Sequence, residues 1–392
     1  MKSMIRITSA ALSVLRVSVI GLSLVFACDN TVRGQTSSQP LGKASGQLAM
    51  RAAAPPLLEV LTQSDRHVGL PIHWDDSLAL LLEPSGRMIY VNAKEVAEHR
   101  VLEEAFAPQT VNEARSALVA EFGPGFETAT VGPYVILSKQ GTAQRWRERF
   151  RTLVGGYFQY FEVRGWQLRN PDFPLCVIVL PSRADFDRYC LRETGKSMPN
   201  LLGYYFPKNN RCVLYEVPQA AGSVDWSETE RTIVHEAVHQ LAYNTGIHER
   251  LAANPLWVVE GLATMLEERR ILESRSSTQL TARINPQQLT GIRPILNDPA
   301  QLQTKLSSLV RSDELFKSDP QSAYALAWAL TFYLNERMPN QFNAYTQQVA
   351  KIPKLQEYAE ADRQRDFNRV FEGDMSLLAV QIQKFYGKLK QE

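Results

Sequence analysis

The feature that most constrains this chain is the stretch from Thr232 to Leu241, which reads Thr-Ile-Val-His-Glu-Ala-Val-His-Gln-Leu. Its uncharged, apolar flanks predict a buried helix. Positions four apart lie on one helix face, so His235 and His239 point their imidazole nitrogens toward the same place. With Glu236 they form the HExxH pattern, in which two histidines bind one zinc ion and the glutamate acts on water beside it. The alternative interpretation is two core histidines beside an uninvolved glutamate.

A catalytic zinc ion needs a third protein ligand. Glu260 is the best candidate, because it lies in the apolar sequence Pro255-Leu-Trp-Val-Val-Glu-Gly-Leu-Ala263. A buried carboxylate is costly there unless it is paired or binds a cation. Asn254 and Pro255 are expected to be the N-cap and first residue of this helix. If Glu260 instead faces solvent, the rival carboxylates are Glu249, Glu267 and Glu268.

Other zinc patterns fit less well. A metzincin requires Gly at position 242 and His at position 245, where this chain has Ala242 and Thr245. His248 lies beyond Gly246, the expected end of the helix, and is a poor geometric substitute. We therefore expect one Zn²⁺ per chain, bound by His235, His239 and Glu260.

The sequence HEAVHQ followed by WVVEGLA resembles the gluzincin metallopeptidases. It is most similar to a peptidase-MA-like group of exported bacterial proteins called domain of unknown function 1570 (DUF1570), over roughly residues 126 to 336. Further stretches that carry this resemblance are Gly203-Tyr-Tyr205, Asn244-Thr-Gly246, Ile284-Asn285 and Tyr324-Ala-Leu-Ala-Trp-Ala-Leu330. The resemblance implies a zincin-like core and a peptide or protein substrate. The exopeptidase signature GAMEN is absent, so aminopeptidase activity is not implied.

The zinc chemistry assigns roles to further residues. Zinc activates a water molecule, and Glu236 is expected to take its proton as general base. The gluzincins that the chain resembles also use a tyrosine to stabilise the oxyanion, and Tyr324 is the candidate. The other interpretation of Tyr324 is a core aromatic beside Trp328. Thr264, one turn after Glu260, is a candidate for orienting a ligand.

The N-terminal residues predict export. Three basic residues precede an apolar run from Val17 to Ala27, which is too short to span a bilayer and is typical of a signal peptide. We expect residues 1–34 to be the signal peptide and the protein to be periplasmic, cell-surface or extracellular, without a membrane span. Cys28 would be open to lipidation only if cleavage preceded it, and Phe26 is an unusual neighbour for a lipoprotein signal.

Charge and cysteine content add two expectations. The net charge of +2 gives no electrostatic reason to expect nucleic-acid binding. Removal of residues 1–34 would leave Cys176, Cys190 and Cys212, so at most one disulfide can form. Cys176 is expected in the core, and a Cys190–Cys212 bridge is compatible with the expected compartment.

The expected fold class is α+β. A zincin-like core is predicted in which a mixed sheet is followed by the HExxH helix and a mainly helical C-terminal part. We expect residues 35–57 to be a flexible linker, residues 58–125 a small α+β module of unknown role, and residues 126–392 the metallopeptidase domain.

Local patterns predict several elements. In the small module, Leu78–Leu82 and Met88–Val91 are expected to form a hairpin, followed by helical segments to about Phe122. Leu202–Phe206 and Cys212–Val217 predict a second hairpin just before the HExxH helix. A strand in this place would form the rim of a cleft to which an extended peptide can add.

Two alternatives to a peptidase remain at this stage. One is a catalytically silent relative that keeps the fold as a binding or scaffolding protein. Retention of Glu236 argues against it, because a binding module gains nothing from a general base. The other is a zinc hydrolase of a non-peptide amide or ester, since the same activated water serves both reactions.

Overall fold

The computed structural model describes residues 55–199, 201–216, 227–273, 279–371 and 373–389. The expected signal peptide, Cys28 and nearly all of the expected linker lie outside these residues. The chain forms two compact units, which divide after Ala107. Within the described residues, the smaller unit holds residues 55–84 and 88–107, and the larger unit holds residues 85–87 and those from Pro108 onward.

The smaller unit is an antiparallel sheet with the strand order β4-β3-β2-β1-β5. Its core is formed by Leu58, Val60, Ala79, Leu81 and Val91. Its elements are β1 (Pro56–Thr62), β2 (Arg66–Trp74), β3 (Leu78–Leu82), β4 (Met88–Asn92), the 3₁₀ turn η3 (Ala93–Glu95) and β5 (Val96–Ala105). The predicted hairpin is present as β3 and β4.

One local prediction for this unit is wrong. Residues 96–105, expected to be helical, form strand β5, because they pair with β1 from Val96 to Ala105. Pairing with a neighbouring strand overrides the local pattern. The helix that was expected in this module begins only at Val111 and belongs to the larger unit.

The larger unit contains a mixed sheet with the strand order β6-β7-β8-β10-β9. The central strands β7, β8 and β10 are parallel, and the edge strands β6 and β9 are antiparallel to their neighbours. The strands are β6 (Phe126–Val131), β7 (Tyr134–Lys139), β8 (Leu175–Leu180), β9 (Gly203–Phe206) and β10 (Arg211–Tyr215). The predicted second hairpin is therefore β9 and β10, and β9 lies at the edge.

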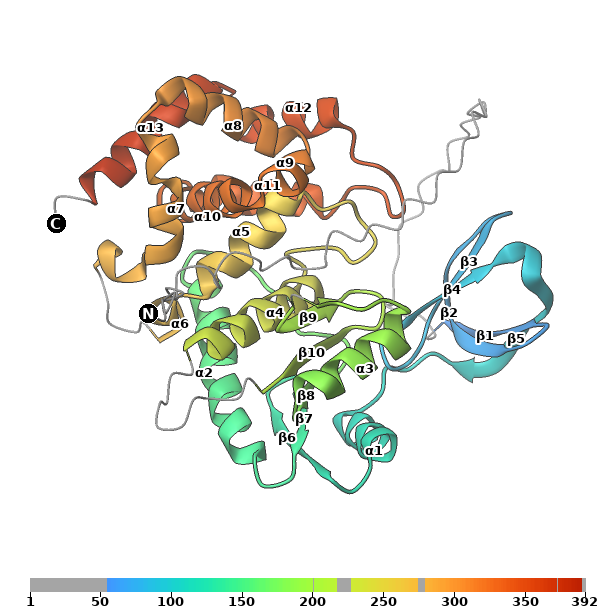
Figure 1. Cartoon of the computed structure of the whole chain (residues 1–392). Helices are drawn as coiled ribbons and strands as arrows, with labels where there is room; N and C mark the ends of the chain where they lie inside the picture. The colour runs from blue at the N-terminus through green and yellow to red at the C-terminus, as the bar shows by residue number, and fades with distance from the viewer. Residues whose placement is uncertain (1–54, 200, 217–226, 274–278, 372, 390–392) are drawn as a thin grey trace, which may run out of the picture. The chain divides into compact units, whose positions relative to one another are not determined.

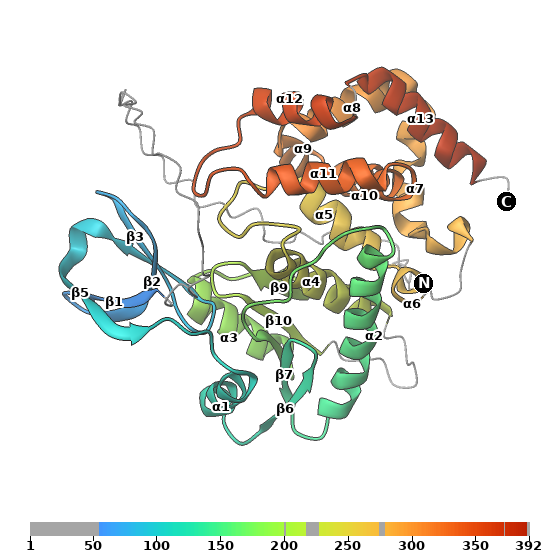
Figure 2. The same ribbon diagram turned by 180° about the vertical axis from the view of Figure 1, so that it is seen from behind.

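Helices cover both faces of this sheet (Figures 1 and 2). Alternate residues of each central strand point to opposite faces, so both faces are apolar. On one face, Ile178 of β8 lies in a core shared with α1 (Val111–Phe122) and α3 (Arg183–Thr194). On the other face, Val177 lies in a core shared with α2 (Ala143–Glu162) and α4 (Ser227–Thr245).

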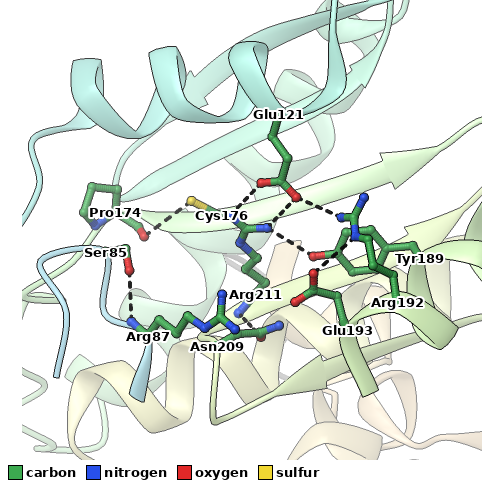
Figure 3. Close-up of polar contacts among 10 residues, drawn as sticks. All are labelled: Ser85, Arg87, Glu121, Pro174, Cys176, Tyr189, Arg192, Glu193, Asn209 and Arg211. Atoms are coloured by element: carbon green, nitrogen blue, oxygen red, sulfur yellow. Dashed lines mark hydrogen bonds and ion pairs between the residues drawn. The ribbon is translucent and has the colours of Figure 1, made fainter. Parts of the chain in front are cut away.

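An ion-pair cluster joins α1 to the rest of the larger unit (Figure 3). Glu121, near the end of α1, accepts hydrogen bonds from Arg192 of α3 and Arg211 of β10, each with an N–O distance of 3.0 Å. Arg211 also donates to the hydroxyl of Tyr189, 3.2 Å away. These contacts explain why the units divide before α1, whereas the sequence placed the module boundary after residue 125.

The two faces also decide the cysteine pairing. Cys190 lies in the core beneath α1 and α3, and Cys212 lies in the core beneath α4. Because the sheet separates them, the Cys190–Cys212 bridge is not formed, and both are free thiols, as is Cys176. Burial raises the pKa of the Cys190 thiol to about 12 and that of Cys176 to about 11, so neither is reactive at neutral pH.

The described part of the chain after α4 is mainly helical, so the predicted α+β class is confirmed. The elements are α5 (Leu256–Leu266), α6 (Arg269–Glu273), η4 (Leu280–Arg283), α7 (Pro286–Leu296), α8 (Pro299–Arg311), α9 (Glu314–Ser318), α10 (Pro320–Arg337), α11 (Pro339–Val349), α12 (Glu360–Phe371) and α13 (Met375–Lys388). Across the described ranges, no helix combines the length and the apolar character needed to cross a membrane.

Helix α10 is the central element of this helical part. It is buried almost without interruption from Ala323 to Asn335, as expected for a helix that is apolar all round. It packs directly on α5 at Gly261, where an added Cβ would lie 2.3 Å from Oγ1 of Thr331 and 2.5 Å from the carbonyl oxygen of Ala327. Only glycine permits this approach, which fixes the position of the neighbouring Glu260.

Candidate metal centre

Helix α4 carries the HExxH residues on its buried face. The rings of His235 and His239 lie side by side, with centroids 4.6 Å apart. The hydroxyl of Tyr134 on β7 donates to the carbonyl of Ala237 at 2.9 Å, which ties this helix to the sheet. The helix ends at Thr245 and is followed by Gly246 with φ of 90°, the left-handed stop that the sequence predicted. The motif is therefore held rigidly within the helix.

Helix α5 brings Glu260 to the histidines. It begins at Leu256, one residue later than predicted, with Pro255 in the capping position. The Asn254 side chain does not cap it, because its amide instead donates to the carbonyls of Glu249 (2.7 Å) and Ala252 (3.0 Å). Asp313 accepts from the Leu256 N–H at 3.0 Å. A residue distant in sequence thus supplies the acidic group at this helix start.

The two helices place three ligand atoms around one point. Oε2 of Glu260 lies 3.3 Å from Nε2 of His235 and 3.8 Å from Nε2 of His239. All three ligand atoms lie within 4.8 Å of one another, and all three residues are buried. Within the described ranges, this is the one group of at least three such side chains close enough to hold a metal ion.

The three residues fit a bound cation. Both ring nitrogens of His239 and Oε2 of Glu260 are buried and form no hydrogen bond of normal geometry within the described residues. Leaving such groups unpaired is costly, and a cation at the centre of the group satisfies them. Two imidazoles and one carboxylate, with the fourth position open to water, are the donor set of a catalytic zinc site.

Electrostatics support the same assignment. Burial, followed by the nearby His235 and His248, holds the pKa of His239 well below its ordinary value, so its ring is neutral as a metal ligand must be. Burial also lowers the pKa of His235, but the carboxylates of Glu260 and Glu267 outweigh burial and raise it to about 10. The site therefore favours positive charge beside these carboxylates.

Glu236 faces the edge strand of the sheet. Its side chain is buried, and Oε2 accepts a hydrogen bond from the backbone N–H of Tyr205 on β9 at 2.7 Å. A Cβ added to Gly203 on the same strand would lie 3.5 Å from Cγ of Glu236. The glutamate is thus fixed between its own helix and the backbone of β9.

Glu267 makes a contact that the sequence did not predict. It was weighed only as a rival ligand, but its Oε1 lies 2.8 Å from Nδ1 of His235 and both side chains are buried. It stands two helical turns after Glu260, a spacing that places both carboxylates on one face. A carboxylate on the outer nitrogen of a metal-binding histidine fixes its ring orientation and tautomer. That spacing was the signal available in the sequence.

The remaining candidates are not members of this group. Glu249, Glu268 and His248 do not belong to it. Thr264 is buried, but its hydroxyl forms no hydrogen bond among the described residues, so an orienting role has no support. Tyr324 is half-buried on α10, with its ring 5.4 Å from that of Phe316.

Comparisons with known proteins agree with part of this picture. A family model described as "Protein of unknown function (DUF1570)" matches residues 230–356, which confirms the predicted resemblance over this part of the chain. Comparison with curated proteins found no match. Among solved structures, the chain is similar to yeast LTA4 hydrolase in complex with bestatin, with 13% sequence identity and a TM-score of 0.35.

That similarity is partial. It covers 65% of this chain and only 37% of the yeast protein.

Proposed function

We propose that this protein is a zinc-dependent metallopeptidase of the gluzincin type. The observation that carries the proposal is the buried group of His235, His239 and Glu260, whose ligand atoms lie within 4.8 Å of one another next to Glu236. The zincin-like character of the core belongs to the same proposal and is supported by the order of mixed sheet, HExxH helix and helical part.

Each residue has a defined task. His235, His239 and Glu260 would bind the ion, and Glu267 would orient His235. When bound there, zinc acidifies a water molecule and polarises the substrate carbonyl. Glu236 takes the proton of the attacking water and passes it to the leaving amine. The Tyr205 N–H keeps the Glu236 carboxylate in place for this transfer.

The edge of the sheet supports a peptide as substrate. Strand β9 lies at the edge of the mixed sheet, and Glu236 contacts its backbone. An extended peptide that added to this edge would pass beside the proposed general base. This favours peptide bonds over a non-peptide amide or ester, and the presence of Glu236 favours an enzyme over a silent binding protein.

Tyr324 is the proposed oxyanion donor. Its spacing from Ala327 and Thr331 places it on the face of α10 that contacts α5 next to Glu260. A donor beside the metal would share the negative charge that develops on the carbonyl oxygen.

Metal analysis and peptide cleavage test the proposal. The purified chain is expected to contain one zinc ion and to cleave a peptide library. Glu236→Gln should lower kcat by a factor on the order of 10² to 10⁴ while retaining zinc. Glu268→Gln, outside the ligand group, is the matched control. Zinc-free protein, or equal cleavage by wild type and Glu236→Gln, would contradict the proposal.

The third ligand is tested separately. Glu260→Ala should reduce the zinc content, whereas Glu249→Ala should leave it unchanged. Normal zinc content in Glu260→Ala would return the assignment to Glu249 or Glu267.

We also propose export to the periplasm, cell surface or medium, on the basis of the basic and apolar residues before Cys28. Sequencing the N-terminus of the protein recovered from cell fractions tests this, and recovery of uncleaved protein in the cytoplasm would contradict it.

A further inference from the structure

The face of α4 beside the candidate metal centre carries two amide side chains that bind the β9–β10 hairpin. Nε2 of Gln240 donates to the carbonyl of Asn210 at 2.7 Å and to that of Cys176 on β8 at 3.2 Å. Nδ2 of Asn244 donates to Oδ1 of Asn210 at 2.8 Å. Gln240 directly follows His239, Asn244 lies about one turn later on the helix, and neither is a member of the ligand group.

Asn210 is the hairpin residue that receives these contacts. Its Nδ2 donates back to Oδ1 of Asn244 at 3.0 Å, so the two amides form a reciprocal pair. The hydroxyl of Tyr205 donates to the same Oδ1 of Asn210 at 2.9 Å. Asn210 has φ of 55°, a left-handed conformation that asparagine tolerates better than most residues. Hydrogen bonds to the side chain and to the main chain of the buried Asn210 therefore hold the hairpin turn against α4.

These bonds determine where the backbone of β9 lies. The strand has four residues and pairs with β10 on one side, so sheet bonding alone holds it weakly. Tyr205 belongs to this strand and donates its N–H to Glu236 at 2.7 Å. A shift of the hairpin by a fraction of an ångström would lengthen and weaken this bond, and proton transfer is sensitive to displacements of that size.

We propose that Asn210, Gln240 and Asn244 form a clamp that positions the edge strand β9 against Glu236. They are positioning residues, because they act on the reaction only through Tyr205 and Glu236. The inference deepens the proposed function and rests on it for the role of Glu236 as general base. The clamp itself has a readout that does not require activity.

Amide hydrogen exchange at Tyr205 measures the clamp directly. Asn244→Ala, Gln240→Met and Asn210→Gly each remove part of it, and Asn210→Gly keeps the left-handed backbone without strain. Each variant should accelerate exchange of the Tyr205 amide by about fivefold or more, while the amide of Val213 on β10 stays protected. Zinc content should remain that of wild type, and kcat should fall with a smaller change in KM.

Thr245→Ala is the matched control. Thr245 follows Asn244 on α4, but its hydroxyl pairs with the hydroxyl of Tyr157 on α2 at 3.0 Å, away from the hairpin. Thr245→Ala loses a buried hydrogen bond in the same turn of α4 but leaves the clamp intact. It therefore measures how much a loss of stability by itself changes amide exchange at Tyr205. The Asn210→Gly/Asn244→Ala double variant should be no worse than the more affected single variant, because both changes break one reciprocal pair.

The two proposals fail in different ways. Exchange at Tyr205 that is equal in wild type and all clamp variants, or equally raised by Thr245→Ala, overturns the clamp. Loss of zinc in the clamp variants also overturns it, because the residues would then support the metal and not the strand. A wild-type protein that cleaves no peptide, with exchange still raised selectively at Tyr205, contradicts the proposed function and leaves the clamp as a structural device.

Discussion

Oε1 of Glu267 lies 2.8 Å from Nδ1 of His235, and both side chains are buried. Nε2 of the same histidine faces Glu260 at 3.3 Å. The imidazole is thus held between Glu260 of α5 and Glu267, the C-cap residue of the same helix, with one carboxylate near each nitrogen. If Nε2 bound a metal ion, the Nδ1–H group would donate a hydrogen bond to Glu267, and this bond would orient the ring.

Removing this carboxylate should weaken metal binding without removing a ligand. Glu267→Ala is expected to raise the dissociation constant for zinc on the order of 10- to 100-fold, because the His235 ring loses its orienting partner. Competition with a chromogenic chelator measures this, with Glu268→Ala as control. An affinity equal to that of wild type would show that Glu267 does not support the site.

The hydroxyl of Tyr324 is expected to matter for the reaction and not for the fold. Tyr324→Phe should lower kcat on the order of 10²- to 10³-fold with unchanged zinc content and melting temperature. Tyr333→Phe is the control, since this α10 tyrosine donates to Gln381 at 3.1 Å. Full activity of Tyr324→Phe would establish the alternative, a packing role beside Trp328.

His248 should make the fold sensitive to acid. It is buried, and burial lowers its pKa from 6.5 to about 3. Between these values the unfolded chain takes up a proton that the folded chain does not, so stability present above pH 6.5 is lost as the pH falls. The free energy of unfolding loses about 1.4 kcal/mol per pH unit from this residue, and the loss levels off near pH 3.

Denaturant unfolding at several pH values measures this slope. In His248→Leu, the free energy of unfolding should depend less steeply on pH, because up to one proton fewer is taken up on unfolding. This holds whatever the effect of the substitution on stability at neutral pH. Ile247→Val, a change at the buried neighbour of His248 that carries no titratable group, should leave the slope unchanged. An identical slope in His248→Leu and wild type would refute the prediction.

The contact between α5 and α10 should tolerate no side chain at Gly261. Gly261→Ala is expected to destabilise the protein by about 1–3 kcal/mol, because its Cβ would overlap Thr331 and Ala327. It should also weaken zinc binding, since Glu260 is the preceding residue. Gly155→Ala on α2 is the control: its Cβ meets nothing within 4 Å, and helix propensity predicts a gain of roughly 0.5–1 kcal/mol. Thermal unfolding compares the two variants.

Sequence reasoning succeeded where the signal is local and periodic. The four-residue spacing of His235 and His239 sets their common face, because helix geometry allows no other outcome. Glu260 was expected near the histidines because a carboxylate in an apolar helix needs a partner, and its Oε2 lies 3.3 Å from Nε2 of His235. The hairpin of β9 and β10 was readable from two apolar runs around a turn.

The sequence-based predictions failed where a residue distant in the chain forms a contact that the local pattern does not show. Asn254 fits the start of α5, but its side chain binds its own loop, and Asp313 takes the helix start instead. Residues 96–105 form a strand because β1 offers a pairing edge. The Cys190–Cys212 bridge, which the sequence left open, is not formed because the two residues lie on opposite faces of one sheet.

The sequence by itself determined that His235 and His239 share one face of a buried helix, because positions four apart lie on the same side of any α-helix, and that Glu236 stands next to the first of them. Only the tertiary structure decided which other groups surround these residues: Glu267 at Nδ1 of His235, and the Tyr205 N–H on Glu236. The physical reason is that helix geometry is set by neighbours along the chain, whereas contacts between helices and strands depend on packing that no local pattern encodes.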